Sequence, residues 1–522
     1  MSFQESHPGI RAVGRPSGDP TSTANVRVGG PRPVGADLHH APFESAVLFI
    51  FGALAVILGI LMTIPVIVEI AADGNDLYAF LWAAALSIFV GMALALTNRQ
   101  ESILLNIRQT FLLTTLAWFG LSFLAAIPFM FGHLELSLAD AWFETVSGLT
   151  TTGSTVLTGL DSMPPGILLW RALLQWIGGL GIIVMGVAVL PFLRVGGMQL
   201  FRTESSDRSE KLFGRVNEIA GAMLTVYVGL SLLCAALYWA GGMTGFEAIA
   251  HTMTTLSTGG YSTSDQSLAH FSNPLIHWTA IVFMLAGGLP FVPLAHALVG
   301  GFRPLATNNQ IHAILSFLGV VIFVTTAWLW VHNEVPLVDA LRNATFNVVS
   351  VVTTTGYAND DYGLWGPFAI GLFFVLIFVG GCTGSTGGGI KIFRFQIIGR
   401  IIAGHFRTLV TPHAVVVTKY DERLLGDDVI RSVMIFTATF IATVVALGLI
   451  LAALGLDFMT SFSGAATAVA NVGPGLGDVI GPSGNFASLP DSAKWVLSLG
   501  MLLGRLEFFT VLVILTPRFW RG

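Results

Sequence analysis

One short pattern occurs four times in this sequence, as TTTGS (150–154), LSTGGY (256–261), TTTGY (353–357) and ANVGP (470–474). A single Thr-Thr-Gly step is weak, because it occurs by chance in any long apolar chain. Successive glycines of the pattern are 106, 97 and 117 residues apart, at Gly153, Gly259, Gly356 and Gly473. Four steps at a near-regular spacing, each between two apolar segments, indicate an internal repeat.

The residue types in these steps suit a backbone that holds a dehydrated cation. Backbone carbonyl oxygens replace the water shell of a cation without adding fixed negative charge. A strand whose carbonyls converge on one axis needs a residue that tolerates unusual φ and ψ, which accounts for the glycine in each step. Irregular backbone at membrane depth is tolerated only where it lines a water-filled cavity. The pattern therefore predicts four strands around one pore.

The remainder of the chain is apolar enough to cross a membrane many times. It is 54% hydrophobic and 11% charged, whereas soluble domains carry about 25% charged residues. Ten segments approach or exceed the ~20 residues that span a bilayer. They lie at 45–71, 77–97, 109–131, 166–193, 216–240, 275–300, 310–332, 365–402, 430–454 and 490–516. The two cysteines, Cys234 and Cys382, have no metal-ligand spacing, and we expect both to be small membrane-buried side chains.

The charged residues give these segments a direction. Of the 25 lysines and arginines, 21 fall on one side of the predicted membrane, and the loops on the other side are acidic. Positive charge marks the cytoplasmic side of a membrane protein. We therefore expect a multi-pass membrane protein with both termini cytoplasmic. Residues 1–42 are rich in Pro, Gly, Ser and Arg, and we expect a disordered cytoplasmic tail.

A short amphipathic run precedes each Gly step, and each run begins near a carboxylate. These acids are Asp140, Glu247, Asp339 and Asp457. A carboxylate is favourable at a helix N-terminus, so we interpret the runs as re-entrant helices that begin on the outer side. The C-terminal partial negative charge of each helix would then point at the central cavity, where it favours a cation. All four units run in the same order, which disfavours a symporter built from inverted halves.

At this point the sequence resembles the Trk/Ktr/HKT superfamily of potassium transporters, from about residue 43 to the end. The four steps, the glycine-rich stretch 380–389 and Gly504-Arg505 carry the resemblance. It implies four M1-pore helix-M2 repeats around one pseudo-fourfold pore. Two additional N-terminal transmembrane helices are similar to the bacterial TrkH branch. The expected divisions are a tail (1–42), the two extra helices (43–100) and pore repeats 1 to 4 (101–200, 201–305, 306–410 and 411–522).

The resemblance also implies a set of ion-binding residues for K⁺, which is the transported ion. The expected selectivity filter consists of Thr151, Thr152, Gly153, Ser257, Thr258, Gly259, Thr354, Thr355, Gly356, Asn471, Val472 and Gly473. The fourth step departs from the others because Val472-Gly473-Pro474 replaces Thr-Gly, so we expect only quasi-fourfold symmetry. All four glycines are present. Within this superfamily a serine in place of a filter glycine accompanies Na⁺ permeation.

The glycine-rich stretch interrupts the long segment 365–402. Six of its ten residues are glycine, each costing roughly 1 kcal/mol in a helix relative to alanine, so the helix should break there. The resemblance implies a gate loop formed by Gly380, Gly381, Thr383, Gly384, Ser385, Thr386, Gly387, Gly388 and Gly389. Two other interpretations are a helix-packing cluster and a phosphate-binding loop. The phosphate loop lacks its lysine, since residue 390 is Ile, and no βαβ pattern surrounds it.

Arg505 lies midway along the last spanning segment, where an isolated charge is costly. The resemblance places it in the pore beside the gate loop, and Arg505→Ala is then expected to raise conductance or loosen regulation. The alternative is a structural pair with Glu507 or with a helix carbonyl. We expect Arg171 and Arg342 to brace pore helices and Lys494 to snorkel to the membrane interface.

Three classes of function remain to be weighed. The leading one is gated, passive K⁺ uptake, and the alternative is a potassium symporter coupled to Na⁺ or H⁺. His251 is expected to make a buried hydrogen bond rather than relay protons. A membrane enzyme is disfavoured because the sequence has neither H-E-x-x-H, nor G-x-S-x-G, nor paired intramembrane Asp. The resemblance further implies a homodimer in membrane lipid and a cytoplasmic TrkA-type regulator that binds NAD or ATP. We expect no organic cofactor in this chain and no nucleic-acid partner.

Overall fold

The computed structural model describes residues 44–99, 105–188, 216–413, 417–421 and 423–521. The expected tail (1–42) lies outside these described residues. Within them, seven helices are long and apolar enough to cross a membrane, or eight if one sharply bent pair counts as a single span. Large apolar side chains such as Phe89 and Phe323 are exposed on these helices, as expected for surfaces that face lipid. The protein is an integral membrane protein.

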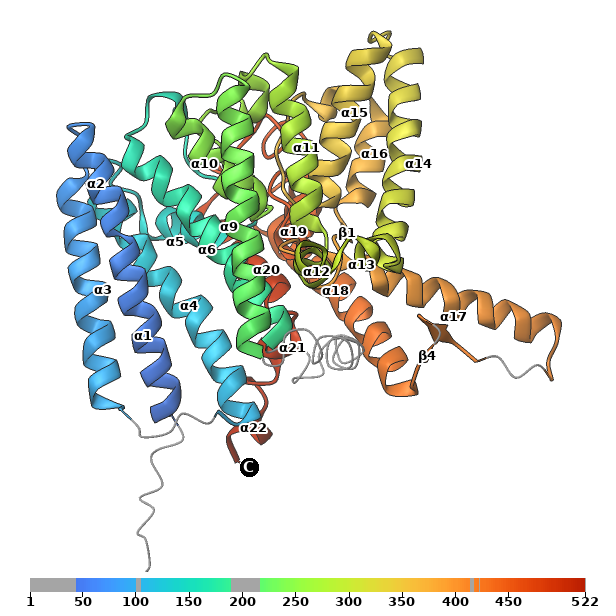
Figure 1. Cartoon of the computed structure of the whole chain (residues 1–522), viewed down its shortest axis with the longest axis horizontal. Coiled ribbons are helices and arrows are strands. Elements are labelled where there is room, and N and C mark those ends of the chain that lie inside the picture. The colour runs from blue at the N-terminus through green and yellow to red at the C-terminus, as the bar shows by residue number, and fades with distance from the viewer. Residues whose placement is uncertain (1–43, 100–104, 189–215, 414–416, 422, 522) are drawn as a thin grey trace, which may run out of the picture. The chain divides into compact units, whose positions relative to one another are not determined.

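A helical hairpin precedes the repeats (Figure 1). It consists of α1 (Ser45–Leu61), which continues almost directly into α2 (Thr63–Ala71), and α3 (Leu77–Thr97). Gly52 and Gly91 lie at the crossing, where each glycine abuts the backbone carbonyl of the other. This close approach lets α1 and α3 pack along their length, as small residues do in membrane helix pairs.

Four units of the same order follow, each a spanning helix, a short pore helix and a second spanning segment. Repeat 1 contains α4 (Ile107–Phe131), α5 (Leu138–Leu149) and α6 (Pro165–Ala188). Repeat 2 contains α9 (Val216–Ala240), α10 (Gly245–Leu256), α11 (Pro274–Gly288) and α12 (Phe291–Gly300).

Repeat 3 contains α14 (Asn309–Val331), α15 (Leu337–Val352), α16 (Pro367–Leu376) and α17 (Ile392–Val410). Repeat 4 contains α18 (Asp427–Ala453), α19 (Phe458–Ala470), α20 (Asp491–Arg505), α21 (Phe509–Leu512) and α22 (Pro517–Arg521). The pore helices α5, α10, α15 and α19 begin on one side, which we call the vestibule side, and the C-terminus lies on the opposite side.

Short elements complete the chain. The 3₁₀ turns η1 (Leu160–Ser162), η2 (Ser267–His270) and η3 (Tyr362–Leu364) follow the first three Gly steps, and α13 (Arg303–Ala306) links repeats 2 and 3. Strands β1 (Val379–Gly380) and β2 (Ile390–Lys391) pair in parallel, and β3 (Lys419–Tyr420) pairs antiparallel with β4 (Arg423–Leu424).

Three second spanning segments are interrupted, although only the break within 365–402 was expected from the sequence. Segment 275–300 was expected to cross as one helix, but α11 and α12 meet at 106°. Pro290 follows the bend and lacks an N–H group, which ends the helical hydrogen bonding. Segment 490–516 likewise breaks after α20, where Glu507 and Phe508 both have positive φ. Only α6 continues unbroken through its described residues.

Candidate ion-binding filter and gate

Three of the four pore helices have a side-chain cap at their first turn, whereas α15 begins after Pro336 without one. The Ser137 and Thr244 hydroxyls accept the backbone N–H of Asp140 and Glu247, and Asp457 accepts that of Thr460. The Thr460 hydroxyl and N–H hold the pKa of Asp457 below its usual range. In α15 the first-turn acid Asp339 pairs with Arg342 at 2.8 Å, so Arg342 contacts its own pore helix.

The backbone after each pore helix follows the same path in all four repeats. One residue adopts a left-handed conformation, and the next donates its N–H to a carbonyl five residues earlier. The left-handed residues are Thr151, Thr258, Thr354 and Asn471. The hydrogen bonds run from Thr152 to Ser147 (2.9 Å), Gly259 to Thr254 (2.9 Å), Thr355 to Ser350 (2.8 Å) and Val472 to Thr467 (3.1 Å).

This common path corrects the expected register of repeat 2. The residue after the donor has positive φ in every repeat, at Gly153, Gly260, Gly356 and Gly473. Gly260 is therefore the equivalent of the other three glycines, and Gly259 corresponds to Thr152 and Thr355. The sequence does not show whether Gly259 or Gly260 matches the glycines of the other repeats, and the hydrogen-bond pattern of the backbone decides it.

The four strands form a closed ring. A Cβ atom added to each of these glycines would lie under 3.0 Å from a carbonyl oxygen of the next repeat. The pairs are Gly153 with Gly259, Gly260 with Thr355, Gly356 with Val472, and Gly473 with Thr152. Because the last pair returns to repeat 1, the carbonyls of four segments far apart in sequence surround one axis. Their close approach requires glycine at each position in addition to its φ.

Hydroxyl and amide groups tie the strands together behind this ring. Thr150 bonds Thr152 at 2.7 Å, and Thr353 bonds Thr355 at 2.8 Å. In repeat 4 the equivalent of Thr151 is Asn471, whose amide donates to the Thr152 hydroxyl at 2.9 Å. Its contact therefore crosses to repeat 1. The Val-Gly-Pro step is accommodated here by cross-repeat bonds, because Ser154 also donates to the Gly473 carbonyl at 2.7 Å.

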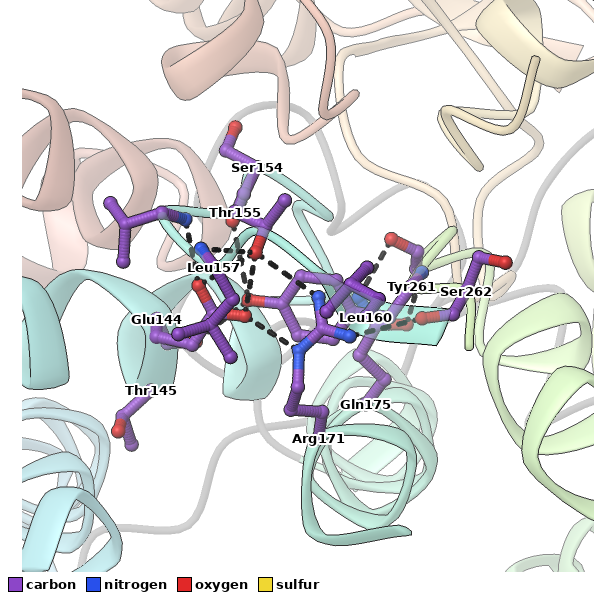
Figure 2. Close-up of polar contacts among 12 residues, drawn as sticks. Glu144, Thr145, Ser154, Thr155, Leu157, Leu160, Arg171, Gln175, Tyr261 and Ser262 are labelled. Carbon is purple, nitrogen blue, oxygen red and sulfur yellow. Dashed lines mark hydrogen bonds and ion pairs between the residues drawn. The ribbon is translucent and has the colours of Figure 1, made fainter. Parts of the chain in front are cut away.

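A buried ion pair supports the first two strands (Figure 2). The Arg171 Nε donates to Glu144 at 2.8 Å, and both side chains are almost completely buried. Arg171 also donates to the Ser262 carbonyl at 3.0 Å and lies over the Tyr261 ring. Glu144 accepts from the Thr155 hydroxyl and the Val156 N–H at 3.0 Å. Arg171 thus braces the pore helix α5 from α6, as expected, and also contacts the backbone after the second Gly step.

The prediction for His251 on the pore helix α10 is confirmed, whereas the prediction for Lys494 on α20 is not. His251 makes the buried hydrogen bonds expected of it, to the Glu247 carbonyl and the Ser262 hydroxyl, both at 2.9 Å. The expectation that Lys494 snorkels was wrong. Its side chain is buried and its Nζ lies 2.5 Å from Asp140, so a pore-helix carboxylate replaces water as its partner. Cys234 and Cys382 are buried and free, as expected.

Directly beneath the ring lies the loop between β1 and β2. Thr386 donates from its hydroxyl to the Gly287 carbonyl at 3.0 Å and accepts from Thr258 at 3.1 Å. Gly388 donates to the Thr354 hydroxyl at 2.7 Å. Both hydroxyls belong to left-handed residues of the predicted filter. A Cβ on Gly388 would overlap the Ala470 carbonyl at the end of α19, so this loop is packed against the base of the filter.

Two cations hold the loop from the side opposite the vestibule. The Arg505 Nη1 donates to the Thr386 carbonyl at 2.8 Å, and the Lys391 Nζ donates to the Gly387 carbonyl at 2.5 Å. Glu507, the alternative partner considered for Arg505, pairs instead with Arg394. Arg505, Lys391 and several loop glycines line a cavity of about 30 Å³. Arg505 therefore contacts the loop backbone directly.

On the vestibule side a cavity of about 230 Å³ opens onto the ring glycines Gly153, Gly260, Gly356 and Gly473. Asp265 also lines this cavity and accepts the N–H groups of Gly159 and Leu160. The structure thus brings all the predicted filter and gate residues into one column, comprising the vestibule, the carbonyl ring, the glycine loop and the arginine.

Sequence reasoning missed several residues of this column. Gln175 and Lys391 contact the filter and the loop, and neither was singled out. A glycine pair also recurs in the second spanning segments, as 178–179, 287–288 and 380–381, with Gly504-Arg505 in the fourth. Gly178, Gly287 and Gly504 each abut a backbone carbonyl in the last turn of their own pore helix. This repeated pair is visible in the sequence, and aligning its four copies places Arg505 at the position of the second glycine in the other repeats.

The fold and the site define a polytopic membrane protein in which four repeats close a ring of backbone carbonyls. The TrkH model, described as a cation transport protein, matches residues 77–521. The chain belongs to this family, which consists of transport proteins and not of enzymes.

Individual relatives agree over nearly the whole chain. The Trk system potassium uptake protein TrkI of Halomonas elongata is 48% identical over 91% of this chain and 96% of that protein. TrkH of Salmonella typhimurium is 38% identical over 91% and 99%. The crystal structure of the potassium transporter TrkH from Vibrio parahaemolyticus superimposes with a TM-score of 0.84 and 34% identity, covering 91% of this chain and 99% of that one.

Proposed function

We propose that this protein takes up K⁺ through a gated, channel-like selectivity filter. The observation that carries the proposal is the closed ring, in which the carbonyls of Thr152, Gly259, Thr355 and Val472 each lie against a glycine of the neighbouring repeat. Converging carbonyl oxygens are the ligands that replace the hydration shell of K⁺. The relatives are named as potassium uptake proteins, which supports the same ion.

Each part of the column has a role in this proposal. The acidic loops on the vestibule side concentrate cations, and the C-terminal ends of four pore helices favour positive charge in the cavity. The filter comprises Thr151–Gly153, Thr258–Gly260, Thr354–Gly356 and Asn471–Gly473, with Ser257 behind the second strand. Repeat 2 thus contributes Gly260 as its ring glycine, in addition to Gly259.

The loop 380–389 acts as the gate in this proposal. Its contacts with Thr258 and Thr354 support a position in the path of an ion that leaves the filter. Arg505 fixes the loop through a charge-assisted hydrogen bond, and its charge raises the barrier to a cation. Opening requires that the loop leave both the filter base and Arg505.

The chain works, in this proposal, as a homodimer in the bacterial inner membrane with its termini in the cytoplasm. A cytoplasmic TrkA-type partner that binds NAD or ATP regulates the gate. The excess of basic residues on the C-terminal side supports the orientation, and the Trk system named for the relatives supports a partner. The proposed flux is passive, and the engagement of both ring nitrogens of His251 in structural hydrogen bonds argues against a proton relay through this residue.

Uptake of ⁸⁶Rb⁺ into liposomes that contain the purified chain tests the proposal. We expect uptake that unlabelled K⁺ blocks and that an equal concentration of Na⁺ leaves largely intact. Empty liposomes are the control. Exclusion of Rb⁺ would overturn the K⁺ assignment, and accumulation that depends on a Na⁺ or pH gradient would overturn passive flux in favour of symport.

A further inference from the structure

One of the four equivalent carbonyl-ring positions is occupied by a residue without a side chain. The four equivalent residues are Thr152, Gly259, Thr355 and Val472. In three of them a β-branched side chain is fully buried behind the strand. In repeat 2 the position is glycine, although its φ lies outside the left-handed region that favours glycine. The backbone of Gly259 therefore accepts a side chain, and its absence needs another explanation.

The explanation is Gln175, which reaches this place from α6 of repeat 1. A Cβ atom on Gly259 would overlap the Gln175 carboxamide, whose nitrogen would lie 2.8 Å away. Gln175 is fully buried, and Figure 2 places it beside Arg171 on the same helix, facing Tyr261. A residue of one repeat thus occupies the space that Thr or Val fills in the others.

Both ends of the Gln175 amide are bonded to the second strand. Its Nε2 donates to the Gly259 carbonyl at 2.7 Å, and its Oε1 accepts the Tyr261 N–H at 3.0 Å. The amide therefore brackets Gly260, the ring glycine of this repeat. A carbonyl oxygen has two lone pairs, so the bond to Gln175 occupies one and fixes the direction of the other.

We propose that Gln175 is a positioning residue that determines ion specificity by fixing the Gly259 carbonyl of the filter ring. The proposal rests on the K⁺ filter proposed above and adds a residue from outside the four steps. Without Gln175 this strand has neither a packed side chain nor a fixed carbonyl. Its oxygen then moves inward to suit a smaller ion, and the preference for K⁺ over Na⁺ falls.

Substitution by leucine separates these roles, because Leu is similar in size but neither donates nor accepts. In the ⁸⁶Rb⁺ assay, Gln175→Leu is expected to retain uptake but to become about fivefold more sensitive to Na⁺ competition, the effect of one lost hydrogen bond. The matched control is Gln396→Leu, another glutamine with two hydrogen bonds, far from the filter. It should leave Na⁺ sensitivity unchanged. Equal Na⁺ sensitivity of Gln175→Leu and the unsubstituted chain would refute the proposal.

An exchange of side chains tests the same space independently of how the leucine variant folds. Gly259→Thr alone places a side chain against Gln175 and should abolish uptake. Gly259→Thr with Gln175→Ala moves the side chain back to the position used in repeats 1 and 3, and should recover at least half of the lost Rb⁺ uptake and Na⁺ discrimination. A double variant no better than Gly259→Thr would refute the proposal. Absence of Rb⁺ uptake by the unsubstituted chain would instead refute the proposed function.

Discussion

At the scale of single residues, the ring glycines differ in how tightly the neighbouring repeat encloses them. A Cβ on Gly153, Gly260 or Gly356 would overlap a carbonyl oxygen, whereas one on Gly473 would lie 2.8 Å from the Thr152 oxygen. All four have positive φ, where a side chain costs about 1–2 kcal/mol. The four glycines share one backbone conformation but differ in how much room the neighbouring repeat leaves for a side chain.

This difference predicts a graded effect of serine substitution. Gly356→Ser should displace the Val472 carbonyl and weaken ⁸⁶Rb⁺ discrimination against Na⁺ strongly, while Gly473→Ser should have a smaller effect because less overlap must be relieved. Na⁺ competition curves for the two variants measure the ranking. Gly371→Ser, a substitution in α16 where no atom lies near the added Cβ, serves as control. The reverse ranking would contradict the ring geometry.

Arg505 carries the second prediction at this scale. Its hydrogen bond to the Thr386 carbonyl joins a charged donor to the loop, and such bonds contribute roughly 1.5–3 kcal/mol. Arg505→Ala should therefore raise ⁸⁶Rb⁺ flux without a regulator about tenfold. Arg342→Ala removes a cation from the start of α15 and should change basal flux much less. Unchanged flux in Arg505→Ala would exclude it from the gate.

At the scale of elements, the gate loop is held by close backbone contacts. The Gly388 backbone lies against the end of α19, whereas Gly384 faces open space. Gly388→Ala should push the loop away from the filter base and raise basal flux several-fold. Gly384→Ala, which has positive φ but no neighbour within reach, should add backbone strain alone and alter flux less. Equal basal flux in both variants would show that the close packing of Gly388 does not hold the loop in place.

The broken second segments also belong to this scale. The glycine content of 380–389 predicted one break, because that composition cannot sustain a helix. The breaks after α11 and α20 were not predicted, since Gly288-Leu289-Pro290 and Arg505-Leu506-Glu507 lie within otherwise continuous apolar runs. Hydropathy reports burial in lipid and not helical continuity. The contacts of the flanking residues, such as Glu507 with Arg394, are visible only in the folded chain.

At the scale of the whole molecule, the ring must close between its first and last repeats without a covalent link. Lys494 of α20 bonds Asp140 of α5, and Trp142 stacks on Trp495. Lys494→Met should lower stability by roughly 1.5 kcal/mol, because the partly exposed Asp140 carboxylate loses a charged hydrogen-bond donor. The measurement is the half-life of the detergent-solubilised protein on heating, which should be shorter for the variant. Lys494→Met with Asp140→Asn should recover part of that loss, and equal decay of the single variant and the unsubstituted chain would dismiss the closure role.

Orientation is also a property of the whole molecule, and the two buried cysteines make it easy to measure. Ser483 is exposed on the vestibule side, and Thr411 is exposed at the end of α17. A membrane-impermeant maleimide should label Ser483→Cys in intact cells, but Thr411→Cys only after lysis. Cys234 and Cys382 are buried, so the unsubstituted chain should give low background. Labelling of Thr411→Cys in intact cells would reverse the predicted topology.

The sequence alone determined the class of this protein, the order of its four repeats and nearly all of the residues that meet in the carbonyl ring and the glycine loop. It could do so because apolar length, charge asymmetry and the glycine steps are local signals. Tertiary structure alone decided the register of the second strand, the partners of Lys494 and Arg505, and the insertion of Gln175 behind Gly259. These depend on which atoms of distant segments meet, and a pattern that repeats every hundred residues does not encode how neighbouring copies share space.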